Sequence, residues 1–441
     1  MNENATKKDE RQRDYRDSGR LLKMPSTQGN SHARTQLDLL EERLQPDDTA
    51  FKKARDFLET RIWLWVWHYL KSRFGGRYEF QNYETGSEDR GIYSLDPSND
   101  SDSDRSVTRI SMTGDWASGT RDAQEIGLAM ARGNPDFTVH LGDIYYVGTK
   151  KEIWENMLGG MTQWPQGLRG SFALNANHEM YARGKAYFKH LLPRLGVREP
   201  AGGEPLGQKA SFFCLRNDHW LIIGLDTGYY SVGIPIIEKI LKPSCRQHVK
   251  ILEWLREDVR LHEDRQRGVI LLSHHQYYSQ FEKYYERSAK QLSELIDRPV
   301  LWFWGHEHRL ALYGKHATRS GELEAFGRCL GHGGLPIEDI VEEPKKDAKH
   351  QVGLVFYDRR QRKTIGSDDV PVGYNGYADL LFEGNELTVE YRDAQNLLVT
   401  ERWEVDGQGN LRGVSIEQHL QHEDLVVHNG AALEDALGVW E

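Results

Sequence analysis

The sequence predicts an α/β fold whose first half alternates strands with helices and whose second half is mostly β. From residue 107 onward, short apolar runs typical of buried strands are separated by segments with helical periodicity. Several of these runs lead directly into a polar cluster that contains Asp, Asn or His. Because open α/β sheets carry their functional groups at the carboxyl ends of strands, we expect one large domain with its site along such an edge.

The composition is typical of a soluble globular protein. The 441 residues are 38% hydrophobic and 28% charged, which suits one large catalytic domain with extensions. The net charge of -10 argues against a broad surface for nucleic acids, although a local basic groove is compatible with it. Cys214, Cys245 and Cys329 are widely spaced and odd in number, so we expect no disulfide framework and a reducing compartment.

We expect a cytoplasmic protein, because the sequence shows neither a secretory signal nor a membrane-spanning stretch. The first 35 residues contain no apolar run. The longest apolar stretch, at 62–70, is shorter than the ~20 residues that cross a bilayer.

Three segments are expected before the catalytic domain. They are a disordered tail at 1–34, a helical extension at 35–83 and an acidic linker at 84–106. The extension includes a helix rich in tryptophan, at Trp63, Trp65 and Trp67. This helix is expected to pack on the catalytic domain, and the alternative is a weak membrane or protein contact.

We expect the catalytic domain over 107–405 and a weakly patterned C-terminal tail over 406–441. In the first half, strands are predicted at 107–112, 137–141, 171–174, 210–215, 220–225, 269–272 and 300–304, and helices at 121–132, 150–158 and 246–262. In the second half, strands are predicted at 310–313, 324–329, 352–357, 377–382, 387–391 and 397–403.

The polar clusters at the strand ends have the chemistry of a site for two metal ions. They lie, in order, at 114–115, 142–146, 177–179, 273–275 and 305–308. Two neighbouring ions need a bridging carboxylate and further oxygen and imidazole ligands. Asp115 and Asp143 follow two successive strands, so they can lie side by side, with Asp143 as the bridging candidate. His306 and His308 can face one way in an extended segment and serve different ions.

This set of motifs resembles the calcineurin-like metallophosphoesterase superfamily and, within it, most closely the purple acid phosphatase branch. The superfamily pattern begins Asp-x-His, but here Asp115 is followed by Trp116 and Ala117. The purple acid phosphatase pattern places a tyrosine three residues after the second aspartate, which matches Asp143 and Tyr146. The resemblance implies a four-layer αββα sandwich.

The sequence also departs from the branch pattern. Ala176 replaces the glycine before the Asn-His motif, Gln276 replaces a proline, and the expected signal peptide is missing. These departures favour a bacterial-type or intracellular relative.

Carried over residue by residue, the resemblance implies two ligand sets. The first ion would be held by Asp115, Asp143, Tyr146 and His308, and the second by Asp143, Asn177, His274 and His306. A phenolate ligand would favour Fe(III) at the first site, with Fe, Zn or Mn at the second. His178 resembles the outer histidine that contacts the phosphate or protonates the leaving group.

The implied function is dinuclear-metal-dependent hydrolysis of phosphate esters by metal-bound hydroxide, with Asp143 and His178 as catalytic residues. The substrate would be a phosphorylated small molecule or a nucleotide. Two alternatives are a phosphodiesterase or nuclease acting at the same site, and a non-catalytic scaffold of the same fold.

Several neighbouring residues allow two interpretations. His275 could line the pocket or lie outside the ligand sphere, and His332 could contact substrate or belong to a turn. Tyr145 becomes an equal candidate for the ligand if Tyr146 packs over the site instead. The aromatic loop at 277–290 could stack on a base or an aryl leaving group, or form a packed lid.

Overall fold

The computed structural model describes residues 76–84, 87–96, 106–232, 243–335, 343–347, 351–363, 371–428 and 431–438. The predicted tail at 1–34, the Trp-rich helix and most of the helical extension lie outside the described residues. None of the helices in the described part of the chain has the length and apolarity that a membrane crossing requires.

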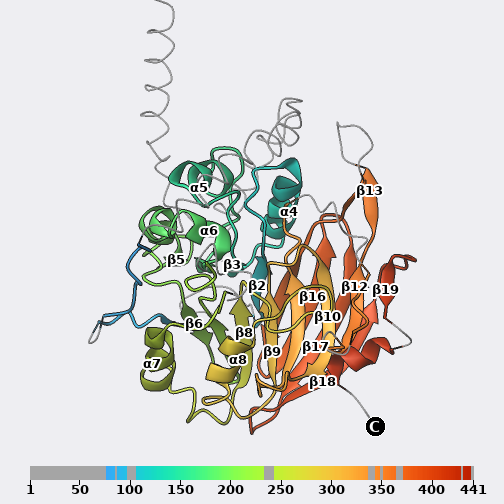
Figure 1. Ribbon diagram of the computed structural model, residues 1–441. Helices are drawn as coiled ribbons and strands as arrows, with labels where there is room; N and C mark the ends of the chain where they lie inside the picture. The colour runs from blue at the N-terminus through green and yellow to red at the C-terminus, as the bar shows by residue number, and fades with distance from the viewer. Residues whose placement is uncertain are drawn as a thin grey trace, which may run out of the picture.

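The structure contains two large mixed sheets (Figure 1). The first has nine strands, in the order β1 (Ile92–Ser94), β6 (Phe213–Arg216), β7 (Trp220–Gly224), β8 (Gly268–Ser273), β9 (Val300–Trp304), β11 (Ala325–Leu330), β10 (Leu310–His316), β12 (Leu354–Asp358) and β19 (Leu425–Val427). The second has eight, in the order β18 (Leu411–Gln418), β17 (Leu397–Val405), β16 (Glu386–Asp393), β15 (Gly376–Glu383), β2 (Thr108–Thr113), β3 (Phe137–His140), β4 (Gly170–Ala173) and β5 (Gly196–Val197). Strands β13 (Gln361–Lys363) and β14 (Pro371–Gly373) form a separate, two-stranded antiparallel sheet.

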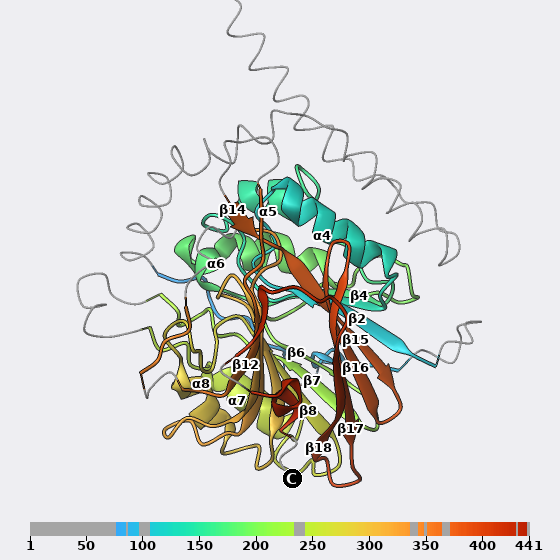
Figure 2. The same ribbon diagram turned by 90° about the vertical axis from the view of Figure 1, so that its right-hand side faces the viewer.

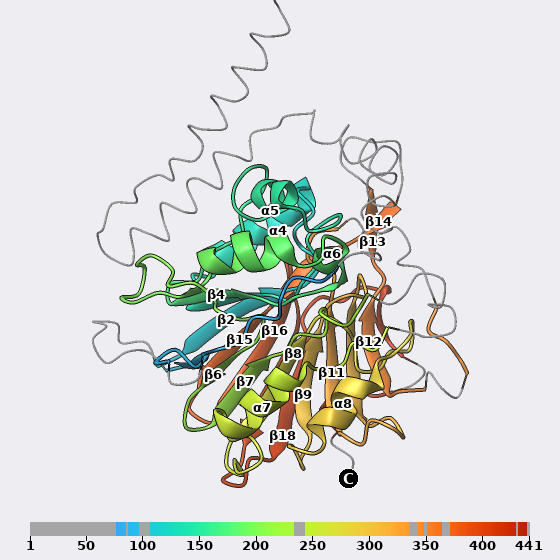
Figure 3. The same ribbon diagram turned by 60° about the vertical axis from the view of Figure 1, so that its left-hand side comes forward.

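Helices cover the outer face of each sheet (Figures 2 and 3). On the second sheet lie α4 (Arg121–Arg132), α5 (Lys150–Asn156), the short α6 (Asn177–Tyr181), a π-helix (Tyr187–Leu191) and a 3-10 turn (Leu192–Arg194). On the first sheet lie α7 (Val249–Glu257) and α8 (Glu286–Leu292). A last 3-10 helix, η3, spans Leu433–Leu437.

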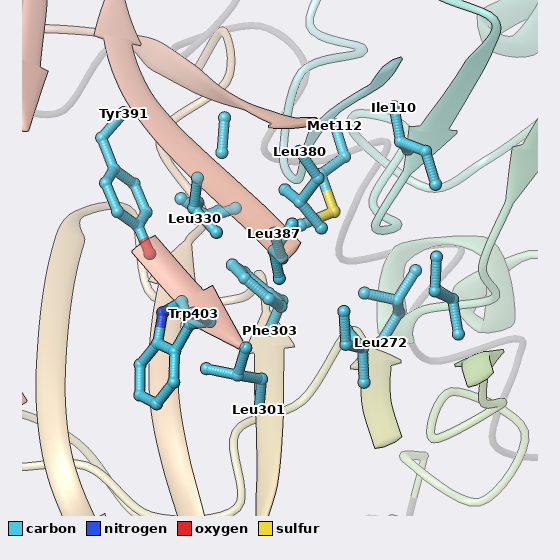
Figure 4. Close-up of a cluster of buried hydrophobic side chains, with 14 of the residues drawn as sticks. Ile110, Met112, Leu272, Leu301, Phe303, Leu330, Leu380, Leu387, Tyr391 and Trp403 are labelled. Carbon is cyan, nitrogen blue, oxygen red and sulfur yellow. The ribbon is translucent and has the colours of Figure 1, made fainter. Parts of the chain in front are cut away.

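The main core fills the space between the sheets (Figure 4). Alternation along β8 shows how the layers form, because Ile270 and Leu272 join this inner core while Val269 and Leu271 face the helical side. Met112 of β2 reaches the same inner core from the opposite sheet. The α/β fold expected from the sequence is therefore confirmed as an arrangement of two mixed sheets.

Most elements of the described region match the predicted strands and helices. Helix α4 has the predicted bounds, with Thr120 accepting a hydrogen bond from the backbone of Ala123 as the N-cap. The helix predicted at 246–262 is shorter and ends at Glu257. The segment 406–441, expected as a tail, supplies β18 to one sheet and β19 to the other. Strand β18 has a weak hydrophobic pattern because it is an edge strand with mostly exposed or half-buried side chains.

A buried ion pair joins the two sheets. Arg328 of β11 donates from Nε to Glu401 of β17 at 3.1 Å, and both side chains are fully buried. Arg328 also donates to the carbonyl oxygen of Ala436 at 2.9 Å. Glu401 accepts further hydrogen bonds from Tyr391 and Trp403, each at 3.1 Å. The two buried charges therefore compensate each other, and the last helix is attached to the same network.

Replacing Glu401 with alanine is expected to lower the free energy of unfolding by about 3–5 kcal/mol, because the Arg328 guanidinium would remain buried without a carboxylate. Glu404→Ala is the matched control, since Glu404 lies on the same strand but pairs with the exposed Arg412. That change should cost no more than about 1 kcal/mol. Urea unfolding of both variants measures the difference, and equal losses would contradict the role of the buried pair.

Candidate metal centre

The site forms where the carboxyl ends of strands from both sheets meet. Strands β2 and β3 are parallel neighbours in one sheet, and they lead to Asp115 and Asp143. Strands β8 and β9 are parallel neighbours in the other sheet, and they lead to His274 and His306. Asp115, Asp143 and His306 have φ angles of 59°, 71° and 68°. Each of these three residues therefore turns sharply away from its strand direction.

Close backbone contacts at glycine positions bring the two sets of strand ends together. A Cβ on Gly114 would lie 3.0 Å from the Cα of Gly305, and a Cβ on Gly305 would lie 2.7 Å from Oδ2 of Asp115. The end of β11 and the glycine-rich segment after it also contact Gly114. Gly114 donates from its backbone to Leu330, and Gly333 donates to the carbonyl oxygen of Gly114, both at 2.9 Å. Side chains at these positions would push the two halves of the site apart.

The first predicted ligand set converges around Asp115. Its Oδ1 atom lies 3.3 Å from Nε2 of His308. Its Oδ2 atom accepts a hydrogen bond from the backbone of His306 at 2.8 Å. The structure thus brings Asp115 and His308 together, as the sequence predicted.

The second predicted ligand set converges around His274. Its Nε2 atom lies 3.3 Å from Oδ2 of Asp143, 3.1 Å from Oδ1 of Asn177 and 3.2 Å from Nδ1 of His306. Its Nδ1 atom contacts the carbonyl oxygen of Leu141 at 3.0 Å, which leaves Nε2 to face the other ligands. One ligand atom from each of Asp115, Asp143 and His274 lies within 4.8 Å of the others, so the two sets adjoin.

The structure brings Tyr145, the neighbour of the predicted ligand Tyr146, to the first ligand set. The Tyr145 hydroxyl donates to Oδ1 of Asp115 at 2.7 Å and lies 2.9 Å from Nε2 of His308. Burial, together with the Asp115 and Asp143 carboxylates, raises the pKa of Tyr145 well above its usual value. The backbone of Tyr146 contacts Glu152 through its N–H and His178 through its carbonyl oxygen. A ligand role for Tyr146 stays a prediction, and Tyr145 has the contacts expected of that ligand.

The donor set fits a bound cation. Asp115 and Asp143 are buried, and among the described residues their ion pairs are all with histidines. Burial would raise the pKa of Asp143, but His178 and His274 hold it well below its usual value. Burial would lower the pKa of His274, but the Asp143 carboxylate raises it to about 9. The carboxylate and the imidazoles therefore stabilise one another's charged forms.

His178 lies beside this cluster and remains accessible. Its backbone donates to Oδ1 of Asp143 at 3.1 Å, and its Nδ1 lies 2.6 Å from the carbonyl oxygen of Tyr146. Its Nε2 atom lies 3.7 Å from Oδ2 of Asp143, and 17% of the side chain is exposed. The ring of Tyr181 packs 5.0 Å away. The contact with Tyr146 thus leaves Nε2 as the nitrogen that can act on a substrate.

Other residues considered from the sequence have structural surroundings. His332 is buried, its carbonyl oxygen accepts hydrogen bonds from Gly376 and Asn375, and burial lowers its pKa to about 3. These contacts favour the turn interpretation. In the 277–290 loop, Tyr277, Tyr278 and Phe281 belong to the helix-covered core, whereas Tyr285 packs edge-on against His275.

Two further residues lie close to the site. Glu179 is fully buried, and neither of its carboxylate oxygens has a hydrogen-bond partner among the described residues. Thr227, which follows β7, contacts His275. The sequence gives a signal for Glu179 through its place beside Asn177 and His178, but none for Thr227.

Replacing Asp143 with alanine is expected to abolish binding of both metal ions, because this carboxylate lies between the two ligand sets. Zn(II) or Mn(II) at about 100 times its Kd should raise the free energy of unfolding of the unaltered protein by about 2.7 kcal/mol. The same metal concentration should not change the free energy of unfolding of the variant. Metal analysis and thermal unfolding measure these effects. Asp406→Ala, at an exposed turn, is the control. Full metal content in Asp143→Ala would contradict this site.

One family model and several solved structures are similar to this chain. The family model for calcineurin-like phosphoesterases matches residues 108–310. Among solved structures, GAP50, described as the anchor in the inner membrane complex of Plasmodium, is 13% identical, with a TM-score of 0.41 over 75% of this chain and 93% of that chain. PhoD is 12% identical, with a TM-score of 0.44 over 72% of this chain and 73% of that chain. No curated protein matches the chain significantly.

The matched segment contains the ends of β2, β3, β8 and β9, with the buried aspartates and histidines that follow them. Over residues 108–310 this chain is therefore similar to the calcineurin-like phosphoesterases.

Proposed function

We propose that the protein hydrolyses phosphate esters with two metal ions bound at the strand ends. The observation that carries this proposal is the convergence of two buried carboxylates with imidazoles from the opposite sheet. Among the described residues, no Lys or Arg forms an ion pair with these two carboxylates. Bound metal ions would supply Lewis-acid activation of the phosphoryl group and of water. Asp115 and His308 would hold one ion, Asp143 would bridge, and three further predicted ligands would hold the other: Asn177, His274 and His306.

The chain's own residues would orient the ester and manage the proton. The Tyr146 carbonyl holds the His178 ring so that Nε2 faces the bridging carboxylate. From this position His178 can bind a phosphoryl oxygen and pass a proton from Nε2 to the leaving oxygen. The buried ligands also exclude bulk water, which strengthens the interaction of these groups with a charged substrate.

We propose that the substrate is a phosphomonoester of a small molecule or a nucleotide. A phosphodiester is the second candidate, because the same ligand set suits both. A panel with aryl phosphate monoesters and matched diesters distinguishes them. Hydrolysis of neither by the fully metal-loaded protein would favour a scaffold instead of an enzyme.

Replacing His178 with alanine is expected to lower kcat by ~100-fold, because the leaving oxygen would lose its proton donor. The metal content should be unchanged, since the predicted ligands remain. His219→Ala, at an exposed position directly before the first residue of β7, serves as the control. Full activity in His178→Ala would disprove the role of this histidine.

We also propose that a tyrosine phenolate binds Fe(III) at the first ion, as in the purple acid phosphatase branch. Tyr145 and Tyr146 provide a matched pair for testing which residue does so. Because the Tyr145 hydroxyl lies beside Asp115 and His308, Tyr145→Phe should abolish the visible absorption of the iron-loaded protein, while Tyr146→Phe should retain it. The opposite pattern would restore Tyr146 as the ligand. A colourless protein with bound iron would exclude both tyrosines.

A further inference from the structure

His275 is a buried imidazole that neither predicted ligand set uses. It is only 3% exposed, and its ring centre lies 4.7 Å from that of His306 and 4.8 Å from that of His274. One nitrogen from each of these three histidines lies within 4.8 Å of the others. His275 therefore stands at the side of the second ligand set, and not in a separate part of the core.

The surrounding residues hold His275 in one orientation. Its backbone N–H donates to Oγ1 of Thr227 at 3.0 Å, and its Nδ1 lies 3.1 Å from the same oxygen. Its carbonyl oxygen accepts a hydrogen bond from Ser273 at 2.9 Å, and Trp302 donates to Ser273 at 2.9 Å. With Nδ1 held by Thr227, Nε2 is the nitrogen that remains for binding.

From this geometry we infer that His275 is an additional ligand of the second metal ion and that Thr227 positions it. The inference rests on the dinuclear site proposed above and adds a third imidazole to Asp143, Asn177, His274 and His306. A histidine that binds a metal through one ring nitrogen usually makes a hydrogen bond through its other ring nitrogen, and this bond fixes the orientation of the ring. Thr227 provides that bond here, and it acts through His275 without touching the metal.

A third imidazole changes which metal the second site selects. Imidazole suits Zn(II) and Fe(II), whereas Mn(II) is better matched by carboxylate, carbonyl and water ligands. The second site should therefore favour Zn(II) over Mn(II) more strongly than a site with two imidazoles. Loss of His275 should reduce that preference while leaving the first ion in place.

Equilibrium dialysis of the full chain against Zn(II) and Mn(II) tests this inference without measuring activity. Four proteins are compared: the unaltered chain, His275→Ala, Thr227→Val and Tyr285→Phe. Zn(II) affinity at the second site should fall on the order of 100-fold in His275→Ala and about 10-fold in Thr227→Val. Mn(II) affinity should change less. Tyr285→Phe is the control, because it alters a neighbouring ring of His275 without removing a proposed ligand.

The outcomes separate this inference from the proposed function. Two ions bound with unchanged Zn(II) affinity in both His275→Ala and Thr227→Val would overturn the ligand role and leave the dinuclear site intact. X-ray absorption of the zinc-loaded proteins gives a second readout, the loss of one imidazole per chain in His275→Ala. If that variant fails to fold, Thr227→Val decides the question. An unaltered chain that binds no metal would overturn the proposed function and this inference together.

Discussion

Close contact between backbones at glycine positions is the constraint on which the site depends. The candidate ligands come from two sheets, and they meet because Gly114 and Gly305 let the strand ends approach without intervening side chains. A Cβ on Gly331 would lie 2.2 Å from the carbonyl oxygen of Glu307, and one on Gly333 would lie 2.4 Å from that of Gly114. Since real Cβ atoms do not approach so closely, the sandwich could close at this edge only with glycine there.

The close approach of the strand ends also buries charged groups, and this explains why the site combines carboxylates with imidazoles. Two carboxylates are buried next to each other, and a buried charge is costly unless it is paired. The imidazoles of His274 and His308 lie within 3.3 Å of these carboxylates and can carry a proton or a metal ion. The carbonyl oxygen of Leu141 fixes one of these rings, so little reorganisation is needed when a cation binds.

The sequence predicted the features that depend on local hydrophobic patterns. It did not predict the features that depend on contacts between distant segments. Apolar runs followed by Asp115, Asp143, His274 and His306 located both the strands and the site, because these polar residues lie at strand ends. The choice between Tyr145 and Tyr146 depends on the path of the chain after Asp143, which spacing alone does not specify. Thr227 gave no signal, because its contact with His275 joins distant segments. Strand β18 was missed because an edge strand buries few side chains.

The attachment of the last helix through Arg328 has a consequence for the limits of the folding unit. The family match ends at residue 310, yet the buried guanidinium needs Glu401 and the carbonyl oxygen of Ala436. A chain shortened at 405 would also remove β18 and β19 and so uncover the edges of β17 and β12. These new edge strands carry more buried side chains than β18 and β19 do, and apolar edge strands are templates for pairing between molecules. Such a fragment would therefore tend to aggregate although every candidate metal ligand remained. The segment that holds the candidate metal ligands is therefore shorter than the segment that completes both sheets.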